Sequence, residues 1–265
     1  GNHLWIGTSE AGVCSYNISN KEFNHLNDWK FSTLNNFICV SGSEIWASTK
    51  KTGVVKTNHD SSQKGWFTQY KTNNGIASVK TNVVFSDREK NIWIGTNKGL
   101  SIRKNNYIEF LDSKLGLDFS NVFSFVIDDF GNYWIAAQEG LFKISIDEMG
   151  ETEQLKLFSA ERFIYHSFIS LYKDNQGFIW AGTYGFGAYK IDAKTLAFEQ
   201  LSEKDGLANN NVIQITGDST SVWFSTLGGG VSNYSILAKT FKNYTIENGL
   251  SSNYIYSTYI DSKNI

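Results

Sequence analysis

The sequence predicts an all-β fold, a β-propeller made of four-stranded antiparallel blades in six repeat units. A short motif centred on tryptophan occurs six times, and its copies lie 41 to 47 residues apart. This spacing matches the period of propeller blades, which is about 40 to 50 residues. Short β-branched and aromatic runs alternate with clusters of Asn, Asp, Gly and Ser, and no window keeps a helical apolar face. Helical solenoids of similar period are therefore excluded.

The motif is the second strand of each unit, strand B. It reads as an apolar residue, Trp, a second apolar residue and two small or hydroxyl residues. A large ring repeated at one position buries about 150 to 250 Å², and we expect it to fill the space between neighbouring blades. The six tryptophans are Trp5, Trp46, Trp93, Trp134, Trp180 and Trp223.

Three further strands complete each unit. In the third repeat we predict strand A at 82–86, strand B at 91–96, strand C at 99–103 and strand D at 107–111. The A–B connections contain Asp, Asn and Gly, the residues of tight hairpins. The D–A connections carry a glycine before an apolar residue, which suits a bend from one blade to the next. These glycines are Gly75, Gly116, Gly206 and Gly249.

The two ends of the chain have complementary phases. Residues 3–26 supply strands B, C and D without a strand A, and residues of about 253–260 supply a strand A at the other end. We therefore predict a single domain over 1–265 in which the C-terminal strand completes the blade begun by 3–26. Such closure removes exposed sheet edges. A closed six-bladed ring and a part of a seven-bladed propeller both fit this pattern.

The composition narrows the classes of partner. Lys and Arg together number 24 and Asp and Glu 26, so there is no basic footprint for nucleic acid. No apolar run has the length of a membrane span. The two cysteines, Cys14 and Cys39, are flanked by strand-like residues, and we expect buried free thiols. No spacing of ligands indicates a metal site, and no motif indicates a cofactor.

The repeat units resemble the two-component regulator propeller repeat. The resemblance rests on units such as 129–135 with 140–142, and on the Gly-Leu elements at 116–117, 206–207 and 249–250. It implies the periplasmic or cell-surface sensor region of a bacterial signalling protein, as in Bacteroidetes hybrid histidine kinases. It also implies a β-sandwich, a transmembrane helix and a kinase outside this chain, a homodimer, and oligosaccharide ligands. Family sensors usually have seven blades, whereas this chain shows six units.

The candidate ligand site lies on the loops between strands B and C and between strands D and A. These connections emerge at the same end of the strands, because neighbouring strands alternate in direction. Tyr184 and Phe186 are flanked by glycines there, and such rings can stack on a sugar. Lys51, Asn97 and Gln138 occupy the same loops in other units. The alternative is that the two aromatic side chains pad the mouth of the channel.

No catalytic constellation accompanies the repeats. The sequence has no G-x-S-x-G elbow, and its four histidines fall at unrelated places. Acidic residues at the A–B turns are expected to cap their own backbone. We therefore predict a sensing module and no enzyme. Two alternatives stay open: a cell-surface or secretion-associated scaffold that binds proteins, and, less favoured, a propeller polysaccharide lyase or hydrolase.

Overall fold

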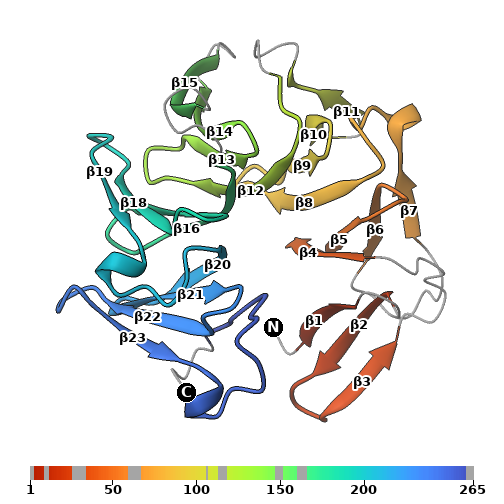
Figure 1. Cartoon of the computed structure of the whole chain (residues 1–265). Helices are drawn as coiled ribbons and strands as arrows, with labels where there is room; N and C mark the ends of the chain where they lie inside the picture. Colours follow the sequence, from red (N-terminus) through yellow and green to blue (C-terminus); the bar gives the residue numbers. More distant parts are fainter. Residues whose placement is uncertain are drawn as a thin grey trace. The chain divides into compact units, whose positions relative to one another are not determined.

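The structure is a computed structural model that describes residues 3–8, 12–25, 34–58, 67–105, 107–112, 118–146, 152–159 and 166–260. Within these residues the chain forms β-strands and short 3-10 helices (Figure 1). None of the helices in the described part is long and apolar enough to cross a membrane. The chain divides into two compact units, Gly1–Val122 and Phe123–Ile265.

The first unit contains three antiparallel sheets in which consecutive strands pair. The first of them is three-stranded and the other two are four-stranded. A short helix, η1 (Thr72–Asn74), follows the second sheet. The strands are β1 (His3–Thr8), β2 (Gly12–Asn17), β3 (Glu22–His25), β4 (Leu34–Ser41), β5 (Glu44–Thr49), β6 (Val54–Asn58), β7 (Phe67–Tyr70), β8 (Thr81–Ser86), β9 (Ile92–Thr96), β10 (Gly99–Lys104) and β11 (Tyr107–Phe110).

The second unit contains three four-stranded sheets of the same meander order. The helices η2 (Glu203–Asp205) and η3 (Ile246–Asn248) follow its second and third sheets. The strands are β12 (Val122–Ile127), β13 (Tyr133–Ala137), β14 (Gly140–Ile146), β15 (Thr152–Ser159), β16 (Phe168–Lys173), β17 (Phe178–Thr183), β18 (Ala188–Asp192), β19 (Phe198–Leu201), β20 (Val212–Gly217), β21 (Ser221–Thr226), β22 (Val231–Ser235) and β23 (Thr240–Tyr244). The all-β prediction and the strand order within the repeat are confirmed.

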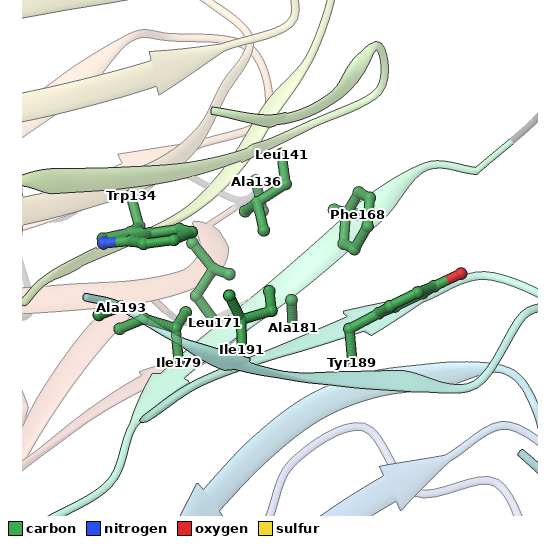
Figure 2. Close-up of a cluster of buried hydrophobic side chains, with 10 residues drawn as sticks. All are labelled: Trp134, Ala136, Leu141, Phe168, Leu171, Ile179, Ala181, Tyr189, Ile191 and Ala193. Atoms are coloured by element: carbon green, nitrogen blue, oxygen red, sulfur yellow. The ribbon is translucent and has the colours of Figure 1, made fainter. Parts of the chain in front are cut away.

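Trp46, Trp134 and Trp180 pack between neighbouring sheets of their own unit, as predicted. Trp134 of β13 belongs to a buried cluster with Leu171, Ile179 and Ile191 of the following sheet (Figure 2). Trp46, Trp93, Trp134 and Trp180 are among the largest fully buried side chains. Trp223 is only partly buried and stacks on Tyr244, with 5.7 Å between ring centroids. The side chain of Trp5 lies outside the described residues.

A buried aspartate fixes each of three A–B turns. In the turn before β17, Asp174 Oδ1 accepts the backbone N–H groups of Gln176 and Phe178, both at 2.9 Å. The other oxygen, Oδ2, accepts the indole N–H of Trp180 at 2.8 Å. Asp87 and Asp128 make the equivalent bonds six residues before their tryptophans. The predicted backbone capping is therefore confirmed, and the carboxylate also anchors the core ring.

The D–A connections bend at glycine, as predicted. After η2, Gly206 has φ 104 and closes the helix with a backbone N–H bond to the carbonyl of Glu203. Gly75 and Gly249 play the same part after η1 and η3, with φ 100 and 98. A side chain is strained in this left-handed region, so glycine is required there. Gly116 lies outside the described residues.

The C-terminal segment differs from the expected strand. Among the described residues, Tyr254 forms an isolated bridge with Leu227, and no strand is assigned at 254–260. Within its own unit the segment is held by Ile255 N–H donating to Thr226 O at 3.0 Å, and by Thr258 N–H donating to Gln214 Oε1 at 3.0 Å. Both bonds join the segment to residues of β20 and β21. Its pairing with residues 3–26, and with it the single closed domain, stays a prediction.

Both cysteines carry free thiols. Cys14 is buried, as expected, whereas Cys39 is partly exposed at the residue level. Burial of the sulfur nevertheless raises the pKa of Cys39 to about 12, and burial also raises the pKa of Cys14.

Candidate functional site

The B–C loop of the second sheet of unit two, residues 183–187, is held rigidly. Thr183 Oγ1 donates to Gly187 O at 2.7 Å and accepts the backbone N–H of Phe186 at 3.2 Å. The N–H groups of Gly185 and Gly187 both donate to Asn210 O, at 3.1 and 2.9 Å. Since Asn210 belongs to the following D–A connection, the two loops that were expected to share a face are hydrogen-bonded to each other.

Tyr184 presents its ring to solvent from this rigid loop. Its side chain is 57% exposed. Its backbone N–H donates to Ser167 O at 3.3 Å, and its backbone forms an isolated bridge with Asn211. The exposed ring therefore stands on a fixed backbone, which is the arrangement required for stacking on a ligand without ordering a loop.

Phe186 is placed differently, although only one residue separates it from Tyr184. Its ring is partly buried and lies 3.5 Å from the ring of His166, measured between centroids. Its carbonyl accepts Gln200 Nε2 at 2.8 Å. Phe186 thus supports the loop, while Tyr184 is the ring that a ligand can reach.

His166 was not among the predicted site residues. It lies two residues before β16, beside Phe186, and its Nδ1 is 3.2 Å from the hydroxyl of Tyr189. Burial lowers the pKa of His166 and raises the pKa of Tyr189 to about 12. A signal was present in the sequence, since His166 stands eight residues before Asp174, just as Asn210 stands eight residues before Asp218.

The remaining predicted residues are spread over other loops. Gln138 is exposed on the β13–β14 loop of the second unit. Lys51 and Asn97 belong to the first unit, where Lys51 is exposed and Asn97 is partly buried. The backbone N–H of Asn97 donates to Lys80 O at 3.0 Å. Tyr184, Phe186 and Gln138 thus share one unit, and Lys51 and Asn97 share the other.

The described residues offer no cluster of three or more metal-binding side chains. The buried carboxylates of Asp87, Asp128 and Asp174 are engaged by turn N–H groups and by tryptophan indoles. The described B–C and D–A loops carry aromatic, hydrogen-bonding and charged side chains.

Comparisons with known proteins agree with the repeat and the fold. Residues 163–185 match the sequence profile of the family described as two component regulator propeller, which confirms the resemblance. No curated protein sequence matches the chain. Among solved structures, the extracellular domain of a protein assigned as a hybrid two-component system of B. thetaiotaomicron is similar, with a TM-score of 0.68 and 18% identity. The similarity covers 99% of this chain and 42% of that one, so this chain spans about two fifths of that domain.

Two other similar structures have different activities. PorZ, a surface component of the type-IX secretion system of Porphyromonas gingivalis, has a TM-score of 0.67 at 13% identity, over 88% of this chain and 37% of that one. Virginiamycin B lyase from Staphylococcus aureus also has a TM-score of 0.67 at 13% identity, over 91% of this chain and 80% of that one. At these identities the likeness establishes the β-propeller fold and leaves the activity to the residues of this chain.

Proposed function

We propose that this chain is the ligand-sensing propeller of an exported bacterial two-component signalling protein, and that it recognises an oligosaccharide on the B–C and D–A loops. The observation that carries the proposal is Tyr184, an exposed ring on a loop whose backbone is fixed by hydrogen bonds to Ser167 and Asn210. Sugar rings have apolar faces, and tyrosine combines such a stacking surface with a polar hydroxyl.

Two further observations support a sensing role. The match to the two component regulator propeller family covers 163–185, the segment that contains Tyr184 and His166. The B. thetaiotaomicron structure that covers 99% of this chain is an extracellular domain, which supports an exported location. A protein-binding scaffold, which the likeness to PorZ favours, is the second candidate. It predicts that no oligosaccharide binds these loops.

Calorimetric titration of the whole chain with a panel of oligosaccharides tests the proposal. We expect saturable binding, and we expect Tyr184→Ala to weaken it about two- to thirteenfold, which corresponds to a stacking contribution of about 0.5 to 1.5 kcal/mol. Tyr107→Ala is the matched control, because Tyr107 is also 57% exposed but begins β11, at the other end of its strands. Binding that survives Tyr184→Ala unchanged would contradict this site, and absence of binding to every saccharide would favour the scaffold.

A further inference from the structure

Five lysines gather on the B–C and D–A loops of the first unit. Three of these loops, residues 50–53, 71–80 and 97–98, contain no Asp or Glu, whereas the D–A connection after β11 carries buried Asp112 and exposed Asp118. All five side chains are exposed. We call these residues the lysine patch: Lys50, Lys51, Lys71, Lys80 and Lys98.

Backbone hydrogen bonds join the three loops into one surface. Gly53 N–H donates to Val79 O at 2.8 Å, which brings loop 50–53 to loop 71–80. Asn97 N–H donates to Lys80 O at 3.0 Å, which brings loop 97–98 to the same place. A Cβ on Gly53 would lie 2.0 Å from Tyr70 O, so the residue before Lys71 also lies against loop 50–53. The five lysines therefore lie on adjoining loops.

None of these ammonium groups is neutralised within the described part of the chain. The ion pairs found there join Lys56 to Glu44, Lys143 to Asp128 and Lys173 to Asp129, and no lysine of the patch takes part. Like charges on adjoining loops repel one another and raise the local potential, which attracts anions. The chain as a whole has a formal net charge of −2, so the patch is opposite in sign to the average.

The gathering of lysine is not a consequence of the repeat. In the second unit the described loops at the same end of the strands carry four carboxylates and a single lysine. These residues are Glu139, Glu203, Asp205 and Glu247, with Lys204. Ser202 and Thr245 stand where the first unit has Lys71. Glu139 stands where the first unit has Lys98, so the positive charge belongs to particular side chains of the first unit.

We propose that the lysine patch binds the carboxylate or sulfate groups of an acidic oligosaccharide. This inference rests on the proposed function and narrows its ligand class. Lysine is a flexible point charge, suited to acidic groups spaced along a sugar chain. Single-stranded nucleic acid is a poorer fit, because its recognition uses aromatic side chains for base stacking, and the three loops contain none.

Two variants of equal charge test the proposal on the whole chain. The first is Lys50→Gln/Lys80→Gln/Lys98→Gln, and the second is Lys21→Gln/Lys90→Gln/Lys104→Gln. The lysines of the second variant lie at C–D and A–B turns of the same unit, at the other end of the strands. The probes are oligogalacturonate, paired with its carboxyl-reduced form, and a heparin oligosaccharide, paired with its desulfated, N-acetylated and carboxyl-reduced form. Oligoglutamate and single-stranded DNA are included, and thermal unfolding of each variant reports folding.

We expect at least one acidic saccharide to bind about tenfold or more tightly than its uncharged form. The patch variant should lose this preference, the control variant should keep it, and added salt should reduce it, since screening shortens the Debye length to about 10 Å at 0.1 M. Equal binding of the acidic and uncharged forms, or equal losses in the two variants, would overturn the inference and leave the saccharide proposal standing. Absence of any saccharide binding would overturn both. Tighter binding of oligoglutamate or DNA than of every saccharide would overturn the ligand class.

Discussion

Removing the carboxylate of Asp174 is expected to destabilise the second unit strongly. Asp174 is 1% exposed and accepts three hydrogen bonds, two from the backbone of its turn and one from the indole of Trp180. In Asp174→Ala the N–H of exposed Gln176 can turn to water, whereas the indole N–H of fully buried Trp180 cannot. The indole bond therefore accounts for most of the loss.

The magnitude follows from these three bonds. A hydrogen bond to a charged group contributes about 1.5 to 3 kcal/mol net, and a buried donor left unpaired costs about 1 to 3 kcal/mol. Because the exposed turn N–H can form a hydrogen bond to water in the variant, we expect the free energy of unfolding to fall by about 3 to 4 kcal/mol. For a chain of this size that loss lowers the Tm by about 6 to 16 °C.

Urea unfolding followed by tryptophan fluorescence measures this loss, with Asp218→Ala as the comparison. Asp218 caps its turn through the N–H groups of Thr220 and Ser221 but stands five residues before its tryptophan instead of six. We expect Asp218→Ala to cost less than half as much. A double-mutant cycle with Trp180→Phe should give a coupling of about 1.5 to 3 kcal/mol. A loss under about 1 kcal/mol in Asp174→Ala, or no coupling, would refute the role given to the indole bond.

Three further results are expected. Gly187→Ala should lower the free energy of unfolding by about 1 to 3 kcal/mol, which is more than Gly185→Ala should. A Cβ at Gly187 would lie 2.1 Å from Leu201 O, whereas a Cβ at Gly185 meets nothing within 4 Å. Equal losses in the two variants would contradict this. Burial lowers the pKa of His166 from 6.5, so the unfolded chain binds more protons and stability falls as the pH drops through 6.5. Unfolding measured from pH 7 to 5 should be less pH-dependent in His166→Asn, and parallel profiles would exclude this linkage. With a pKa of about 12, the Cys39 thiol is about one part in ten thousand thiolate at pH 8, so it should react with a disulfide reagent far more slowly in the folded chain than in urea.

The strands could be predicted because the same residue pattern recurs in every repeat unit. Strand D of the third repeat was expected at 107–111 and is observed at Tyr107–Phe110. The capping of the A–B turns was also predictable, since Asp caps its own turn locally. The indole bond was not, because it depends on how the ring of Trp180 is oriented across the hairpin. The segment 254–260 shows the same limit, since strand assignment needs a partner and a local pattern does not supply one.

The candidate site was predictable as a set of loops and less so as a set of side chains. Glycines flank both Tyr184 and Phe186, yet only Tyr184 is largely exposed, because Phe186 packs on His166. That contact joins two segments separated by about 20 residues, and sequence spacing does not reveal it. The lysine patch could not be recognised from the overall composition, because the net charge sums the positively charged loops of one unit with the negatively charged loops of the other.

Three repeats have the same backbone hydrogen bond between the B–C loop and the D–A connection, but the residues that form it differ in their side chains. The residue that follows strand B donates its backbone N–H to the carbonyl of the residue that directly precedes strand A. The donor and acceptor pairs are Asn97 with Lys80, Tyr184 with Ser167, and Leu227 with Asn211. A bond between backbone atoms leaves the side chains free to vary, whereas the buried aspartate and tryptophan of each turn depend on their side chains. Exchange of an exposed side chain at these positions, as in Lys80→Asn, should therefore change the free energy of unfolding by no more than about 0.5 kcal/mol while altering ligand binding. A large loss of stability in Lys80→Asn would show that these side chains serve the fold and not recognition.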